Sequence, residues 1–153
     1  MPSLLPVKIL TAQGTLFSGN VLSLHTRTSV GEITILPLHT QLITPLQNTE
    51  VTLDSGEQQL HMHVAIGVLE VSSNHAVTIF ASKAELPAHL NETALAEHIA
   101  AAEQKLAAAH TLSDEEVATV AAQLERNLSR LKFVRKHSRM RPPNHAGSGM
   151  FTG

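Results

Sequence analysis

The stretch GEITILPLHTQLITPL, Gly31–Leu46, sets two carbon-rich runs on either side of one His-Thr pair. Pro37 and Pro45 interrupt those runs. Proline cannot donate to a sheet ladder, so a plain buried strand does not explain this pattern. Three alternatives remain open for the stretch: a catalytic loop, a metal site, or a surface that contacts a partner.

Short β-rich segments surround this stretch and continue as far as Ala81. Turn residues separate them at Gln13-Gly14, Ser18–Asn20, Asp54–Glu57 and Ser72–Asn74. Short segments at this spacing favour an antiparallel sandwich or barrel. Because side chains alternate along a strand, the run Leu60–Val64 predicts His61 and His63 on the outward face.

The period of the apolar residues changes after Pro87. Asn91 predicts a helix N-cap, and the Ser113–Glu116 segment predicts a capping box. Apolar residues then repeat at intervals of three and four along two helices that a short connection must fold back antiparallel. The predicted stripes are Leu95, Ile99, Ala102, Leu106 and Ala109 in the first helix, and Val117, Val120, Leu124, Leu128, Leu131 and Val134 in the second.

The fold class is therefore two-domain, β then α. We expect a β domain over residues 1–86, a helical hairpin over 87–138 and a disordered tail over 139–153. The hairpin is rich in alanine, and the free energy of burying its stripes is close to the cost of ordering its backbone. Such a unit could open without losing its helices, and a permanently docked hairpin is the alternative.

Composition excludes several classes of function. The net charge is −2, and the four aromatic residues are all Phe, so neither charge nor aromatic stacking favours nucleic acid. The chain has no Cys, which excludes disulfides and thiol chemistry. The N-terminus does not resemble a signal peptide, and no apolar run is long enough to span a bilayer.

Catalytic and metal motifs are weak in this sequence. His61 and His63 could supply two ligands, but a zinc site needs three or four, and no nearby residue completes the set. Phosphate-binding, dinucleotide-binding and nucleophile-elbow motifs are absent. We therefore expect no catalytic residue, metal or cofactor, with a small histidine-metal β-barrel enzyme kept as an alternative.

Basic residues crowd the end of the second predicted helix. The five that we single out are Arg126, Arg130, Lys132, Arg135 and Lys136. Cations suit the negative end of a helix dipole, which is the simpler interpretation. Their number exceeds what a dipole needs, which favours docking to an acidic partner surface.

The order of several motifs resembles one known family. FSGNVLSL, GEITILPLHTQLITPL, IGVLEV and AVTIFASKAE precede an alanine-rich helical hairpin, as in the epsilon subunit of F-type ATP synthase, the counterpart of mitochondrial delta. Within the central motif, Gly31, Glu32, Ile35, Leu36, Pro37, His39, Leu42 and Thr44 fit the family pattern. The similarity runs from about Val7 to His137.

This resemblance implies a non-catalytic rotor subunit with a sandwich of about ten strands and a regulatory hairpin. The sandwich is expected to bind the gamma subunit and the ring of membrane c subunits. The expected contact residues are Glu32, Leu36, Pro37, His39 and Leu42. The subunit is expected to be a peripheral membrane protein on the cytoplasmic face of the bacterial plasma membrane.

The resemblance also implies that the hairpin can extend toward the alpha and beta subunits of the catalytic head and inhibit ATP hydrolysis. Arg126, Arg130, Lys132, Arg135 and Lys136 lie where relatives carry the basic residues for that contact. A helical-hairpin adaptor without a membrane partner is a further alternative.

Some positions depart from the family pattern. Thr34 and Leu38 stand where the family has glycine, so we expect these positions to avoid positive φ and the loop to change its backbone. Some relatives bind ATP through a motif that opens the first helix. Asn91 and Ala94 replace its Asp and Arg here, so we expect no tight ATP binding.

Overall fold

The computed structural model describes residues 3–138, and these fall into two compact units. The first contains the strands and ends at Leu86, and the second begins at Pro87 and contains the helices. The predicted disordered tail, 139–153, lies outside the described residues. Each unit is described by itself below.

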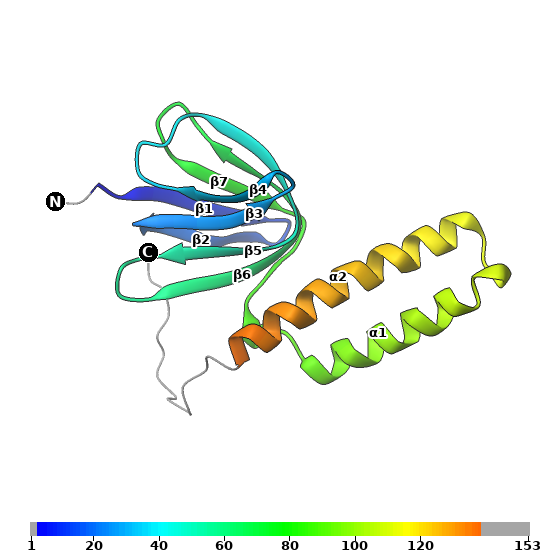
Figure 1. The fold of residues 1–153 in the computed structure, drawn as a ribbon. Helices are drawn as coiled ribbons and strands as arrows, with labels where there is room; N and C mark the ends of the chain where they lie inside the picture. Colours follow the sequence, from blue (N-terminus) through cyan, green and yellow to red (C-terminus); the bar gives the residue numbers. More distant parts are fainter. Residues whose placement is uncertain (1–2, 139–153) are drawn as a thin grey trace. The chain divides into compact units, whose positions relative to one another are not determined.

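The first unit is one sheet that curls around a single core (Figure 1). Its strands are β1 (Leu5–Thr11), β2 (Gly14–Val21), β3 (Ser23–Thr28), β4 (Gly31–Ile35), β5 (Leu42–Asp54), β6 (Gln59–Val71), β7 (Val77–Ala81) and β8 (Ala84–Glu85). They follow the order β2-β1-β7-β6-β5-β3-β4, and β8 pairs with β6. The predicted β-sandwich followed by two helices is confirmed. The pairing is antiparallel except between β1 and β7, which run parallel.

The number of strands differs slightly from the expected number of about ten, because the described residues form eight strands. Strands β5 and β6 each have 13 residues and pair with each other along nearly their whole length. Each also pairs with other neighbours along its length, β5 with β3 at its C-terminal end and β6 with β8 and β7. Two long bent strands thus take the place of several shorter ones.

The core of this unit draws side chains from seven strands, β1 to β7. In β1, the alternation Leu5, Val7 and Ile9 is buried, as the period of two requires. The buried cluster consists of Leu5, Val7, Ile9, Phe17, Val21, Leu24, Ile35, Leu46, Val51, Leu53, Met62, Val64, Leu69, Val71, Val77, Ile79 and Ala81. The cluster is continuous within the first unit, so this unit has its own hydrophobic core.

The second unit is an antiparallel helical hairpin (Figure 1). Its elements are the 3-10 turn η1 (Pro87–His89), helix α1 (Glu92–Ala107), the 3-10 turn η2 (Ala109–Thr111) and helix α2 (Asp114–Ser138). Oδ1 of Asn91 accepts a hydrogen bond from the Ala94 N–H at 3.0 Å. Ser113 and Glu116 exchange backbone and side-chain hydrogen bonds, both at 3.1 Å. Both predicted caps are therefore confirmed.

Four large side chains hold the two helices together: Leu95 and Ile99 from α1, and Leu131 and Val134 from α2. Leu128 departs from the predicted stripe, because 45% of its surface is exposed. A step of four residues turns a helix about 40° beyond a full turn, which carries Leu128 past the direction of Leu124 and off the packed face. These four residues lie toward the open end of the hairpin, and farther along it Ala102 is buried while Leu106, Val117 and Val120 are half-buried.

Candidate functional site

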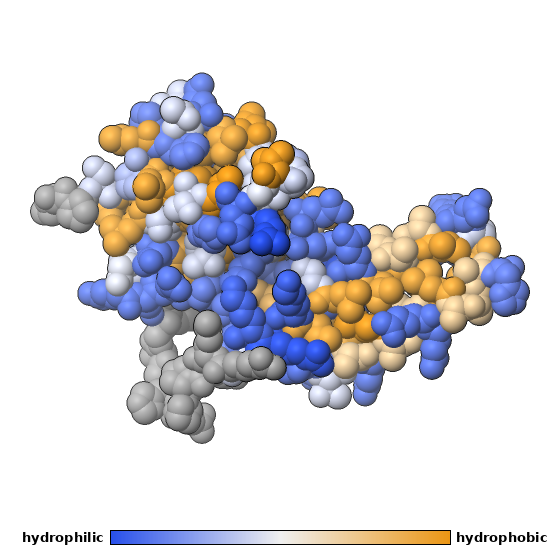
Figure 2. Space-filling model, viewed as in Figure 1, coloured by the Kyte–Doolittle hydropathy of each residue, from blue (hydrophilic) through white to orange (hydrophobic). Residues whose placement is uncertain are grey.

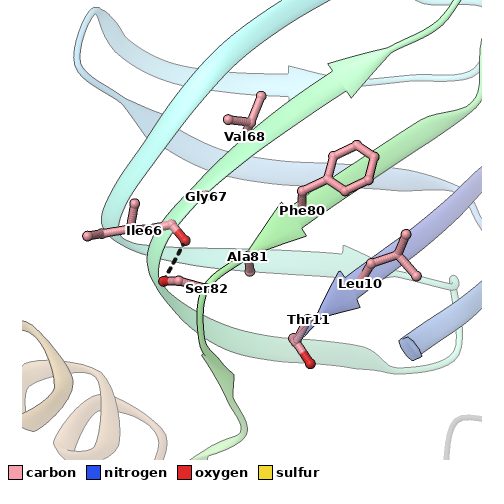
Figure 3. A pocket seen from close by; sticks show the side chains of 8 residues that line it. All are labelled: Leu10, Thr11, Ile66, Gly67, Val68, Phe80, Ala81 and Ser82. Atoms are coloured by element: carbon pink, nitrogen blue, oxygen red, sulfur yellow. Dashed lines mark hydrogen bonds between the residues drawn. The ribbon is translucent and has the colours of Figure 1, made fainter. Parts of the chain in front are cut away.

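The outer face of β1, β6 and β7 carries an apolar patch, which we call the β6–β7 patch and define as Leu10, Ile66, Val68 and Phe80 (Figure 3). Ile66 is 63% exposed, Phe80 50% and Val68 40%. Cross-strand pairing places Leu10 opposite Phe80, and Phe80 opposite Val68, so three of these side chains form one row. Large apolar groups in one exposed cluster indicate an interaction surface rather than scattered surface residues.

Strands β6 and β7 approach each other closely at the β6–β7 patch. Gly67 lies between Ile66 and Val68, and a Cβ atom there would be 2.6 Å from the carbonyl oxygen of Phe80. The Ile66 carbonyl accepts hydrogen bonds from the Ser82 N–H at 2.8 Å and from the Ser82 hydroxyl at 3.0 Å (Figure 3). Glycine is therefore required here for close strand packing rather than for an unusual φ.

Sequence reasoning missed the β6–β7 patch, although a signal was present. Residues Val64–Leu69 and Val77–Ala81 are apolar on nearly every position instead of on every second one. Strands that are apolar on both faces are ordinarily covered on both faces. In the described chain, the inward residues Leu69 and Ile79 are fully buried while the outward ones remain exposed.

The predicted contact loop follows β4 and contains Leu36, Pro37 and His39. Leu36 is 56% exposed, whereas Leu42 begins β5 and packs partly buried against the core. The expectation that Leu38 avoids positive φ is wrong, because its φ is 67°. Thr34 lies within β4 and is not among the positive-φ residues. The loop thus presents Leu36 and His39, and not Leu42, as candidate contacts.

Glu32 lies away from this loop, at the other end of β4. Its carboxylate pairs with the Arg27 guanidinium at 3.0 Å, and both side chains are mostly exposed. The family resemblance implies that Glu32 and His39 belong to one contact set. The structure separates them by the length of β4, so a single small contact would not cover both.

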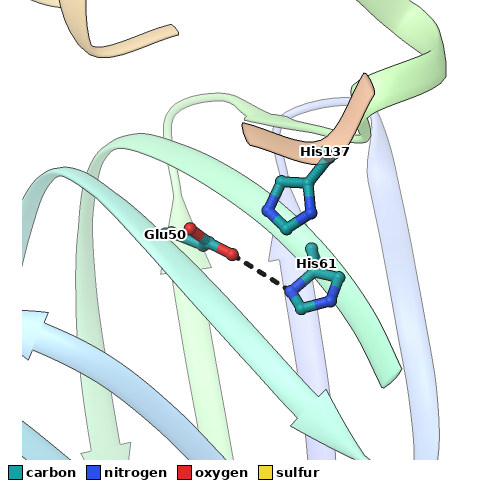
Figure 4. Close-up of side chains that lie close together, drawn as sticks. All are labelled: Glu50, His61 and His137. Atoms are coloured by element: carbon teal, nitrogen blue, oxygen red, sulfur yellow. Dashed lines mark ion pairs between the residues drawn. The ribbon is translucent and has the colours of Figure 1, made fainter. Parts of the chain in front are cut away.

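The two strand histidines have different surroundings. Nδ1 of His61 is 3.0 Å from Oε1 of Glu50 on the neighbouring strand (Figure 4), and the Thr52 hydroxyl lies 3.1 Å from the same ring nitrogen. His63 is only 1% exposed and lies opposite Glu85 in the β6–β8 ladder. The prediction that both rings face outward into solvent is therefore wrong for His63. His61 and His63 therefore do not present two equivalent, solvent-accessible rings to a metal ion.

The basic residues of α2 differ in their surroundings. Nη1 of Arg130 donates to the Asn127 side chain at 3.0 Å, within α2. Nε of Arg135 donates to Oε1 of Glu92 at 2.8 Å, which links the end of α2 to the start of α1. Lys132 and Lys136 are exposed. Figure 2 shows an apolar stripe along the hairpin between polar side chains. An apolar contact and the Arg135–Glu92 ion pair thus join the two helices near the open end of the hairpin.

No helix in the described part of the chain is long and apolar enough to cross a membrane.

Comparisons with known proteins agree with the order of the motifs. The family described as "ATP synthase, Delta/Epsilon chain, beta-sandwich domain" matches residues 4–87. The ATP synthase epsilon chain of Hydrogenovibrio crunogenus is 33% identical over 130 residues, covering 85% of this chain and 88% of that protein. The epsilon chain of Nitrosococcus oceani is 36% identical over 135 residues, covering 85% and 91%. A chain in the structure of Euglena gracilis mitochondrial ATP synthase has the same fold, with a TM-score of 0.71, 15% identity, and 90% and 84% of the two chains covered.

Proposed function

The chain belongs to the delta/epsilon family of ATP synthase, and from that premise we propose a rotor subunit that couples the gamma subunit to the c-ring. Its role is mechanical and regulatory, and we assign it no catalytic residue, metal or cofactor. Epsilon-chain relatives cover most of its length, which supports assigning both the sandwich and the hairpin to this role. The alternatives of a histidine-metal enzyme and a free adaptor are not favoured by this membership.

The observation that carries the proposal is the β6–β7 patch. It lies in the unit that matches the family, and Ile66, Val68 and Phe80 are exposed although their neighbours in the same strands form the core. We assign gamma to this patch, because burying a side chain such as Phe80 supplies much of the free energy of a protein interface. An apolar row on a rigid sheet also loses little conformational entropy when it binds.

We assign the c-ring to the loop after β4, with Leu36, Pro37 and His39 as its contacts. The exposure of Leu36 and the absence of Lys, Arg, Asp and Glu from Leu36–Gln41 suit a contact with a protein surface. Leu42 supports the loop from beneath, and Glu32 belongs to a separate, charged surface with Arg27. The complex would hold the subunit peripherally, on the cytoplasmic face of the bacterial plasma membrane.

We assign the regulatory role to the hairpin. Opening it would free Arg135 from Glu92 and present it with Arg126, Arg130, Lys132 and Lys136 to acidic residues of the alpha and beta subunits. The cost of opening is modest, since the buried apolar cluster between the helices is small and the Arg135–Glu92 ion pair is exposed. A catalytic head that contacts the extended α2 would then hydrolyse ATP more slowly.

A charge placed in the patch tests the gamma assignment. Phe80→Asp should weaken binding to purified gamma at least 10-fold, because the interface would bury an unpaired carboxylate. The matched control is Thr34→Asp, which adds the same charge on the exposed side of β4, outside the patch. Circular dichroism should show both variants folded. Equal binding by the wild type and Phe80→Asp, with both folded, would show that gamma binds elsewhere.

Removal of the hairpin tests the regulatory assignment. A chain ending at Leu86 should still assemble into the enzyme, and ATP hydrolysis by the reconstituted complex should increase. A second variant tests the basic residues themselves. It removes three positive charges by changing Arg126, Arg130 and Lys132 to Gln, and ATP hydrolysis should increase in it too. If neither change alters hydrolysis, the inhibitory role is wrong, whereas the coupling role is unaffected.

A further inference from the structure

Leu38 has a strained backbone conformation, and its apolar side chain is exposed to solvent. Its φ is 67°, in the left-handed region that L residues other than Asn, Asp and His rarely adopt. The other two non-glycine residues with positive φ in the described chain are Asn48 and His75, types that tolerate this region. Leu38 is also 69% exposed, so burial of its side chain does not compensate for the strain.

Several hydrogen bonds fix the backbone conformation of the loop Leu36–Gln41. The His39 N–H donates to the Leu36 carbonyl at 3.1 Å and closes the turn around Leu38. The His39 ring donates from Nδ1 to the Thr40 carbonyl at 2.7 Å. The His75 ring donates from Nδ1 to the His39 carbonyl at 3.0 Å, which ties the loop to the turn between β6 and β7. Pro37 further restricts the backbone. The backbone at Leu38 is therefore fixed in a conformation that leaves its side chain exposed.

The surroundings of Leu38 select the chemistry of its partner. The two segments that His75 joins, Leu36–Gln41 and Ser72–Ala76, contain no Lys, Arg, Asp or Glu. An anionic lipid surface would gain no attraction from such a region. Leu36 adds a second exposed apolar side chain beside Leu38. These features fit an uncharged, apolar protein surface.

We propose that Leu38 is the apolar anchor of this end of the sandwich and packs against the c-ring. The inference rests on the proposed function and assigns one residue of its ring contact. Backbone strain in a folded protein persists where function retains it. A leucine on a fixed backbone gives up little conformational freedom when it packs against a partner.

Two substitutions separate the strain from the side chain. Leu38→Ala removes most of the side chain and leaves a non-glycine residue at positive φ, so the Tm of the chain should stay within about 2 °C of the wild type. Leu38→Asn removes the apolar contact and supplies a residue that tolerates the left-handed region, so the Tm should rise by about 4 °C. Leu4→Ala is the matched control, since Leu4 is an exposed leucine outside the loop, with 51% of its surface accessible.

The binding assay uses purified c-rings in detergent and the full-length chain, alone and in complex with gamma. Both Leu38 variants should bind rings about 10-fold more weakly or worse, because the contact loses a buried leucine side chain. Leu4→Ala should bind as the wild type does. Both Leu38 variants should bind gamma normally, since the β6–β7 patch is unchanged. A more stable Leu38→Asn protein that binds rings more weakly cannot owe that loss to unfolding.

Two results would overturn this inference. Ring binding by either Leu38 variant at wild-type affinity would show that the leucine is no anchor. Failure of the wild-type chain to bind rings, with gamma binding intact, would remove the anchor and leave the gamma assignment in place. Failure to bind both partners would instead refute the proposed function itself.

Discussion

Substitution of Gly67 by alanine tests whether close packing of β6 on β7 holds the β6–β7 patch in shape. The added Cβ would lie 2.6 Å from the Phe80 carbonyl oxygen, 3.2 Å from Val64 Cγ1 and 3.3 Å from Ala81 Cα. Real Cβ contacts stay above 3.0 Å, so the strands must separate by at least the difference, 0.4 Å. The nearest atom belongs to the backbone, and no side-chain rotation can relieve the overlap.

Two opposing effects determine how much Gly67→Ala changes the free energy of unfolding. Overpacking of this kind costs about 1–3 kcal/mol. Replacement of glycine also restricts the unfolded chain, which stabilises the folded state by about 0.4–1 kcal/mol. The two ranges leave a net loss of about 0–2.6 kcal/mol, centred near about 1.3 kcal/mol, which corresponds to a fall in Tm of about 5–10 °C for a unit of this size. The Phe80 row should shift with β7, so gamma binding should weaken together with stability.

The assay is thermal unfolding of the full-length chain, followed by far-ultraviolet circular dichroism, with gamma binding measured below the transition. Val68→Ala is the control, since it shortens a half-exposed neighbour in the same strand without adding an atom to the β6–β7 contact. It should lower the Tm by less than Gly67→Ala does. A Gly67→Ala protein that melts at or above the wild-type temperature would refute the close-packing argument.

Three further predictions concern the stability of each unit and the ion pair between the two helices. Asn91→Ala removes the N-cap bond to the Ala94 N–H and should cost about 1 kcal/mol, measured as a loss of helical signal and a lower unfolding temperature of the hairpin. A double-mutant cycle of Glu92→Gln and Arg135→Gln should give a coupling of about 0.2–1 kcal/mol that disappears at about 1 M salt, and a salt-independent coupling would contradict an exposed ion pair. A fragment of residues 1–86 should fold cooperatively, because its core cluster draws on no helix, and dispersed amide resonances would check this.

Local signals were sufficient to predict much of the chain. The caps at Asn91 and at Ser113–Glu116 depend on residues within a single helical turn, and the structure contains both. The change of period after Pro87 depends on neighbouring residues too, and the second compact unit begins there. Leu128 shows the limit of a one-dimensional stripe, since the opposing helix decides which edge of the stripe is covered.

The alternation rule succeeded in β1 and failed in part of β6. Leu5, Val7 and Ile9 are buried while the residues between them are exposed, because one face of β1 meets the core and the other does not. Met62, His63, Val64 and Ala65 are all buried in succession. Strand β8 pairs with β6 at His63 and Val64, and this short strand lies some twenty residues further along the chain. Its pairing is a long-range event that no local pattern predicts.

The sequence by itself determined the family, the β-then-α organisation and the helix caps, because each depends on the order of motifs or on neighbours within a few residues. Only the tertiary structure decided which apolar residues remain exposed. Ile66, Val68 and Phe80 are as apolar as their buried neighbours, and their exposure follows from which face of β6 and β7 the rest of the sheet curls around. The left-handed backbone of Leu38 was likewise decided by hydrogen bonds to residues that fold beside it, including His75 from a distant turn.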